Sequence, residues 1–162
     1  MIFHIFGGQC SGKTSVAEQL DLNVFACWDI LYDFYIHEGI IKDNKMDWNK
    51  WQFRESKIEK NIQDFIKVNN ESKHIAIVSS GTNKKVNKII KGFDKVIPVN
   101  LGVPNDKDIV ERVKAKGFDL EQVKEFNAFT RTKFARLSKY LPNVLTVEEA
   151  VAFIKEKTTD CG

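Results

Sequence analysis

One short stretch near the start of the sequence constrains the fold of this 162-residue chain more than any other. The apolar segment 2–6 leads directly into Gly7-x4-Gly12-Lys13-Thr14, and a helical pattern follows. A strand, a glycine-rich loop and a helix in this order form a cradle for phosphate groups. The glycines let the backbone approach a polyphosphate closely, with several N–H groups pointing inward. The stretch therefore predicts a nucleoside triphosphate site.

Each residue type in this loop has a chemical role in such a site. The Lys13 ammonium can reach the β- and γ-phosphates, and the Thr14 hydroxyl can ligate Mg²⁺. The start of the helix adds partial positive charge at the same place. We therefore expect ATP and Mg²⁺ as cofactors. The predicted nucleotide-binding residues are Gly7, Gly8, Gln9, Cys10, Ser11, Gly12, Lys13, Thr14 and Ser15.

Composition places the chain among ordinary globular proteins. Hydrophobic residues make up 43% and charged residues 29%, and the length suits one domain. Three widely spaced cysteines indicate a reducing compartment. The sequence also has no signal-peptide pattern and no long apolar stretch. These observations predict a cytoplasmic protein without a membrane partner. A net charge of +3 permits contact with nucleic acid without requiring it.

The hydrophobic pattern alternates between strands and helices along the whole chain. Expected strands lie at 2–6, 23–28, 73–79, 95–101 and 142–146, and expected helices follow the loop and lie at 30–38, 47–68, 84–91, 106–116, 119–140 and 147–157. Asp47 and Asp119 are expected helix N-caps. This alternation predicts an α/β layered fold with a parallel sheet, whose ligands bind at the carboxyl ends of the strands.

Two large classes of triphosphate-binding protein fit the sequence poorly. The segment Asn83-Lys-Lys-Val86 lacks the aspartate with which GTP-binding switches read the base. Motor-type ATPases need a carboxylate after a second apolar strand to hold Mg²⁺. Here the strand at 73–79 ends in Ser79-Ser80.

In element order, nearly the whole chain resembles the nucleoside and nucleotide kinase branch of the P-loop fold, which also contains shikimate, gluconate and polynucleotide kinase-like enzymes. The phosphate loop is the specific motif in this resemblance. The resemblance implies a single domain, 1–162, with a three-layer fold and a five-stranded parallel sheet of order 2-3-1-4-5 flanked by helices. It also implies an acceptor-binding helical region at about 30–70 and a lid at about 112–131.

Within this resemblance, Asp29 matches the aspartate that many members carry after the second strand as a general base. The alternative is that Asp29 is an ordinary helix N-cap. Asp33, one turn later, is a second candidate for contact with the acceptor. Arg54 matches an arginine that grips an anionic group of the acceptor, and the alternative is a surface ion pair with Glu55.

The lid of this family carries arginines that close over the phosphates. Arg112 and Arg131 are therefore candidate catalytic residues together with Lys13 and Asp29, and Arg136 is a candidate acceptor contact. Ser80, with its neighbours, could orient the acceptor or a water on Mg²⁺. His4 is expected to be a packed core histidine.

The leading hypothesis is an ATP-dependent kinase that transfers the γ-phosphoryl group to a nucleoside, a nucleotide or a similar small hydroxyl acceptor. One alternative is a kinase acting on a nucleic-acid hydroxyl, at a 5′ end or on a hydroxymethylated base. Another is a nucleotide-binding module with weak or no catalysis. A small-molecule partner is expected in the leading case, and the chain is compatible with a monomer or a homodimer.

Overall fold

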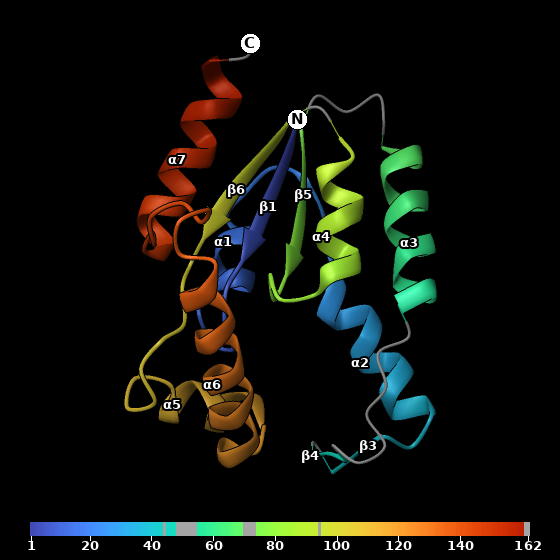
Figure 1. Cartoon of the computed structure of the whole chain (residues 1–162), viewed down its shortest axis with the longest axis vertical. Coiled ribbons are helices and arrows are strands. Elements are labelled where there is room, and N and C mark those ends of the chain that lie inside the picture. Colours follow the sequence, from blue (N-terminus) through green and yellow to red (C-terminus); the bar gives the residue numbers. More distant parts are fainter. Residues whose placement is uncertain (44, 48–54, 70–73, 94, 161–162) are drawn as a thin grey trace.

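The computed structural model describes residues 1–43, 45–47, 55–69, 74–93 and 95–160, and Figure 1 shows their arrangement. Strands and helices alternate along most of the chain. In order they are β1 (Ile2–Phe6), α1 (Lys13–Glu18), β2 (Asn23–Ala26), α2 (Cys27–His37), β3 (Ile41–Lys42), β4 (Lys45–Met46), α3 (Glu55–Val68), β5 (Ile75–Ser79), α4 (Lys84–Lys91), β6 (Val96–Asn100), α5 (Val110–Lys116), α6 (Leu120–Arg136) and α7 (Val147–Asp160).

The main sheet has four parallel strands in the order β2-β5-β1-β6. With the small β3-β4 hairpin set aside, this is the predicted order 2-3-1-4. Every residue of β1 and β5 is buried, as expected for central strands covered on both faces. Pro98 lies in β6, an edge strand of the sheet, where the missing N–H is tolerated. The α/β fold class is therefore confirmed.

The expected fifth strand at 142–146 is not formed. This segment runs beside β6 with one backbone hydrogen bond, from the Leu145 N–H to the Asn100 oxygen at 2.9 Å. The side chain of Asn100 adds a second link by donating to the Pro142 oxygen at 3.1 Å. A side-chain bond thus takes the place of a second ladder bond, and the segment stays irregular.

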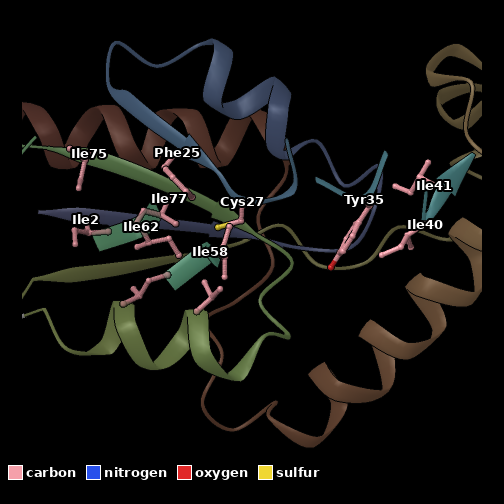
Figure 2. Packing of buried hydrophobic residues seen from close by; sticks show 12 residues of the cluster. Ile2, Phe25, Cys27, Tyr35, Ile40, Ile41, Ile58, Ile62, Ile75 and Ile77 are labelled. Carbon is pink, nitrogen blue, oxygen red and sulfur yellow. The ribbon is translucent and has the colours of Figure 1, made fainter. Parts of the chain in front are cut away.

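Helices cover both faces of the sheet, with α3 and α4 on one side and α1 and α7 on the other (Figure 1). Residues of alternate parity on each strand supply the two cores, because strand side chains alternate between faces. On the first face, Figure 2 shows Ile58 and Ile62 of α3 beside Ile77 of β5. On the second face, Val16 and Ile154 pack with the odd-numbered residues of β1. None of the described helices is long and apolar enough to cross a membrane.

Several predicted boundaries were wrong around α2 and the hairpin. The second strand ends at Ala26, and α2 begins at Cys27. The segment between the expected helices at 30–38 and 47–68 contains β3 and β4, and the Asp47 N–H extends this hairpin by donating to the Ile40 oxygen at 2.9 Å. The predicted N-cap role of Asp47 depends on residues 48–54 and stays a prediction. The described part of the long helix begins at Glu55, and residues 48–54 lie outside the described ranges.

Farther along the chain, α4 has the predicted bounds, whereas α5 begins at Val110, later than expected. Asp119 is confirmed as the N-cap of α6, because its carboxylate accepts the Gln122 N–H at 3.1 Å.

Candidate functional site

The loop between β1 and α1 is packed closely against the backbone after β6. The Gly8 N–H donates to the Gly102 oxygen at 2.9 Å. A Cβ on Gly7 would lie 2.8 Å from the same oxygen, so this position has no room for a side chain. Gly12 adopts a left-handed φ of 98°, which a glycine tolerates without strain. The glycines of the motif thus let the loop adopt its tight shape.

Lys13 lies in the first turn of α1 and folds back over the loop. Its Nζ donates to the Gly7 oxygen at 2.7 Å and to the Gly8 oxygen at 3.2 Å. Burial of the ammonium, with a smaller contribution from the positive charge of Lys116, lowers the pKa of Lys13 to about 8. Thr14 and Ser15 follow on the same turn with exposed side chains. An anionic ligand here would meet an ammonium that has no carboxylate partner among the residues that the structure describes.

Ser11 supplies a second sign that the loop is built for a ligand. Its Oγ is buried and has no hydrogen-bond partner among the described residues. Buried hydroxyls are normally hydrogen-bonded, so each exception calls for a physical reason. A phosphate oxygen would accept from this hydroxyl. The donor set of the loop therefore fits a polyphosphate.

Arg112 of α5 is the predicted lid arginine that contacts the loop. Its Nη1 donates to the Cys10 oxygen at 2.7 Å, across a separation of 102 residues. The Cys10 side chain is buried with Ile109, Val113 and Val123, so α5 and α6 form a packed cover on this part of the loop. The guanidinium is thereby held beside the candidate phosphate site.

Arg131, the second predicted catalytic arginine, and Arg136, a predicted acceptor contact, have no described contact with the loop. The Nη2 of Arg131 donates to the Pro104 oxygen at 3.1 Å and lies 3.7 Å from an Asp106 carboxylate oxygen. Arg136 is exposed at the last residue of α6. The structure thus brings Arg112, and neither Arg131 nor Arg136, into contact with the loop.

Sequence reasoning missed Asn127, which binds the loop from the middle of α6. The Gln9 N–H donates to the Asn127 Oδ1 at 2.7 Å, and the Asn127 Nδ2 donates to the Gln9 oxygen at 3.1 Å. Asparagine is a poor residue for a helix interior. A lone asparagine between Phe126 and Ala128 was therefore a usable signal, although the sequence could not identify its partner.

Asp29 and Asp33 both lie on α2, directly after β2, with exposed side chains. The N-cap of α2 is Ala26, so the interpretation of Asp29 as an N-cap was wrong. An aspartate in the first turn of a helix is favourable for the helix dipole. The buried Cys27 thiol, whose pKa burial raises to about 12, interacts electrostatically with Lys13. The Cys27 thiol at the start of α2 is therefore within electrostatic range of the Lys13 ammonium. Arg54 lies outside the described residues.

The end of β5 has a serine where a metal-binding carboxylate would stand in many nucleotide-hydrolysing proteins. The Ser79 Oγ lies 2.6 Å from the His4 Nε2 and accepts the Gly81 N–H at 3.1 Å. The Ser80 Oγ lies 2.9 Å from the Thr82 Oγ1, within the turn that precedes α4. Ser79 thus belongs to a buried pair with His4, and Ser80 to a polar turn.

The buried His4 makes a prediction about acid stability. Burial lowers the pKa of His4 from 6.5 to about 4, so the folded protein keeps the ring neutral. The unfolded chain takes up this proton first as the pH falls, and stability is therefore lost between pH 6.5 and about 4. The shift corresponds to about 3 kcal/mol of unfolding free energy.

This prediction can be checked by chemical denaturation across that pH range. A His4→Gln variant keeps a group that can hydrogen-bond to Ser79 but does not titrate. We expect its free energy of unfolding to fall less steeply with acidification than that of the wild type. Equal slopes for the two proteins would contradict the assignment.

The hairpin and α2 touch the junction between α5 and α6 across the site. The Lys45 Nζ lies 3.4 Å from an Asp119 carboxylate oxygen. The Tyr32 and Phe118 rings lie 6.3 Å apart between centroids. The Gln122 N–H, with a contribution from Lys45, lowers the pKa of Asp119. We call these two contacts, Lys45–Asp119 and Tyr32–Phe118, the cross-site bridge.

The phosphate loop after the central strand, the strand order and the helical cover together define the fold of the small P-loop kinases. Deoxyadenosine kinase from M. mycoides with bound dATP aligns with a TM-score of 0.52 at 13% identity, over 98% of this chain and 100% of that chain. Its structure with the products dCMP and a flexible dCDP gives a TM-score of 0.51 at 15% identity, over the whole of both chains.

A gluconokinase from Sinorhizobium meliloti gives a TM-score of 0.56 at 14% identity, over 98% of this chain and 94% of that chain. No protein-family model matches the sequence, and a search of curated proteins finds no similar sequence. At such identities the likeness establishes the fold and leaves the substrate open.

Proposed function

We propose that this protein is an ATP-dependent kinase that transfers the γ-phosphoryl group to a hydroxyl of a small acceptor. The observation that carries this proposal is Lys13, whose ammonium is bound to the Gly7 and Gly8 oxygens over a loop with an unpartnered, buried Ser11 hydroxyl. Phosphoryl transfer depends mainly on positioning and on stabilising negative charge. A preformed cationic loop supplies both.

On the donor side, Lys13 and the amides from Gly12 to Ser15 would hold the phosphates. Arg112, which already contacts the Cys10 oxygen, would stabilise the charge that spreads over the transferred group. Arg131 is a weaker candidate for this role, because its guanidinium binds the 104–106 segment.

Mg²⁺ would be held by the Thr14 hydroxyl together with the nucleotide phosphates, and the ion would neutralise phosphate charge when bound. No three His, Cys, Asp or Glu side chains cluster as a metal site within the described ranges. This donor set suits Mg²⁺, which uses few protein ligands and several phosphate and water oxygens. It would not suit a metal that needs a cage of protein groups.

On the acceptor side, the region at about 30–70 would bind the substrate, and the segment at about 112–131 would cover the phosphates. Asp29, in the first turn of α2, would take the proton of the attacking hydroxyl. Asp33, Arg54, Ser80 and Arg136 are the remaining candidates for contact with the acceptor.

A nucleoside or nucleotide is the first acceptor class to test. Two of the similar structures belong to a deoxyadenosine kinase, and the third belongs to a gluconokinase, so a small sugar-acid acceptor is the natural comparison. The chain is sparing with arginine, with four residues of this type in all. An acceptor that already carries a phosphate is usually bound by several arginines. The small number of arginines therefore favours an acceptor that receives the phosphoryl group on a hydroxyl.

The deciding experiment is incubation of the protein with Mg²⁺ and γ-labelled ATP against a panel of acceptors. The panel contains nucleosides, deoxynucleoside monophosphates, sugar acids, and oligonucleotides with and without hydroxymethylated bases. Transfer of label to one class supports the proposal and names the substrate, and transfer to oligonucleotides alone would favour the nucleic-acid alternative. ATP binding without transfer to any acceptor would contradict the kinase proposal.

A nucleotide-binding module without turnover is a second candidate, favoured by the end of β5. Ser79 stands where a carboxylate would help to hold Mg²⁺, and its hydroxyl is engaged by His4 and the Gly81 N–H. This candidate predicts that ATP raises the Tm whereas no acceptor raises it further. A further increase of Tm with one acceptor would count against it.

The lowered pKa of Lys13 predicts how nucleotide binding depends on pH. The ammonium titrates near pH 8 in the free protein, whereas bound phosphates would raise its pKa. Above pH 8 binding then requires uptake of a proton, and ATP affinity is expected to fall by up to about tenfold per pH unit. Calorimetry in buffers of different ionisation enthalpy measures this uptake.

Lys13→Arg is the matched control for this measurement, since a guanidinium does not titrate in this range. We expect no proton uptake by the arginine variant. A wild-type affinity that stays constant as the pH rises from about 7 to about 9 would show that Lys13 is not the titrating contact.

A further inference from the structure

The side chain of Asn127 binds both backbone groups of one loop residue. Its Oδ1 accepts the Gln9 N–H at 2.7 Å, and its Nδ2 donates to the Gln9 oxygen at 3.1 Å. Asn127 has 0% exposure, so no solvent competes for either bond. The two residues are 118 positions apart in the sequence. This pairing anchors α6 to the loop after β1.

The loop leaves just enough room for this amide. A Cβ on Gly8 would lie 2.9 Å from the Asn127 Oδ1 and 3.0 Å from Val103. The absence of a side chain at position 8 therefore lets Asn127 reach Gln9. The next loop residue, Cys10, has a left-handed φ of 62°, and its oxygen accepts from Arg112 at 2.7 Å. Side chains of α5 and α6 thus bind three neighbouring backbone groups of the loop.

These bonds divide the loop into a first part that is held by α5 and α6 and a second part that is left for a ligand. The Gln9 N–H is already used by Asn127, so it is directed away from a phosphate ligand. The Ser11 N–H donates to the Gly8 oxygen at 3.3 Å, and the amides from Gly12 to Ser15 at the start of α1 remain for the phosphates. A glycine-rich loop is flexible, and ordering it costs conformational entropy at the moment of binding. Fixing its first half in advance removes part of that cost.

We propose that Asn127 is a positioning residue that holds the loop in its phosphate-binding shape before the nucleotide arrives. This inference rests on the proposed function, since it assumes that the loop binds a nucleotide. It goes beyond that function by assigning to α6 a direct part in nucleotide affinity. Figure 1 shows α6 beyond the carboxyl ends of the strands, and the loop after β1 leaves the sheet at this same end.

The same helix offers a matched control. Thr130, one turn after Asn127, also has 0% exposure, but its hydroxyl donates at 3.0 Å to the Phe126 oxygen within α6. Thr130→Val therefore removes a buried polar group from the same helix without touching the loop. Asn127→Leu removes both bonds to Gln9 and keeps the branched shape of the side chain, although its two methyl groups are larger than the amide atoms.

The test measures ATP affinity by calorimetry, Tm, and amide hydrogen exchange of Gln9 by NMR for wild type and both variants. Both substitutions are expected to lower the Tm. Asn127→Leu is expected to weaken ATP binding by about ten- to a hundredfold, as the loss of two buried hydrogen bonds implies, whereas Thr130→Val changes it by less than about twofold. The Gln9 amide should be protected in wild type and in Thr130→Val, and unprotected in Asn127→Leu.

Wild-type affinity in a folded Asn127→Leu protein would overturn the positioning role alone. Failure of the wild type to bind ATP would overturn the proposed function, and the positioning role with it. If the leucine variant does not fold, Asn127→Ser replaces it, because serine keeps a polar group that is too short to bind both groups of Gln9. Rapid exchange of the Gln9 amide in the wild type would also overturn the assignment.

Discussion

Asp29→Asn is expected to lower phosphoryl transfer by about 10²- to 10⁴-fold, the usual contribution of a general base. The amide has the same shape as the carboxylate but cannot accept the proton of the attacking hydroxyl. ATP affinity should change little, because the donor side rests on Lys13 and the loop. The measurement is kcat with the acceptor that the panel identifies, together with ATP affinity by calorimetry.

Asp33→Asn is the matched control for this variant, because Asp33 is also exposed on α2, one turn farther along. As a candidate acceptor contact, Asp33 is expected to raise KM when neutralised and to leave most of kcat, whereas loss of a general base lowers kcat itself. The first-turn position of Asp29 predicts a small loss of stability on neutralisation, about 0.3–1 kcal/mol, which is too small to unfold the protein. Full turnover by Asp29→Asn would exclude Asp29 as the base.

Lys13→Met is expected to lower kcat by at least about a hundredfold, since it removes a cation aimed at the charge that develops during transfer. The free protein should be at least as stable as the wild type. Burial lowers the pKa of Lys13, which means that the fold disfavours its charged form, and a methionine avoids that desolvation.

A Lys13→Met protein with an unchanged or raised Tm and no transfer would assign the loss to electrostatics. Retention of more than about half of the wild-type rate would contradict the role of Lys13. A lowered Tm would show that the bonds to the Gly7 and Gly8 oxygens matter more to the fold than the buried charge does.

Local patterns in the sequence were sufficient to predict the frame of the molecule. The apolar runs of β1 and β5 read as buried central strands, and the loop motif required a helix after β1. Asp119 was recognisable as an N-cap from its place before a helical pattern. These features depend on residues within one or two turns of each other. The strand order of the main sheet came from the family resemblance, and the structure confirms it.

Features that depend on distant partners were not predictable in the same way. Whether 142–146 becomes a strand depends on the ladder it shares with β6, and that ladder amounts to one backbone bond. The hairpin was hidden in a polar segment whose turn includes Asp43 with a left-handed φ of 53°. The Asp43-Asn44 pair stands between Lys42 and Lys45 with apolar residues on either side of them, and such a pair is a turn signal that the polarity of the segment obscured.

In the candidate site, too, local motifs were predictable and contacts between distant residues were not. The sequence located the loop and proposed Arg112 and Arg131 as catalytic arginines, but the packing of α5 against Cys10 brings only Arg112 of these two into contact with the loop. The contact between Asn127 and Gln9 joins residues 118 positions apart and has no local signature beyond an asparagine in a helix. The roles of Asp29 and Arg112 in catalysis remain predictions for the variants described above.

The cross-site bridge has a consequence for how molecules enter and leave the site. An ion pair with the Lys45 side chain 66% exposed is worth at most about 1 kcal/mol, and one aromatic pair adds about 0.5–1.5 kcal/mol. Contacts of this strength favour the joined arrangement by only about one order of magnitude. Thermal energy is therefore sufficient to separate these two contacts, and we expect the hairpin and the α5–α6 junction to part and rejoin without the input of chemical energy.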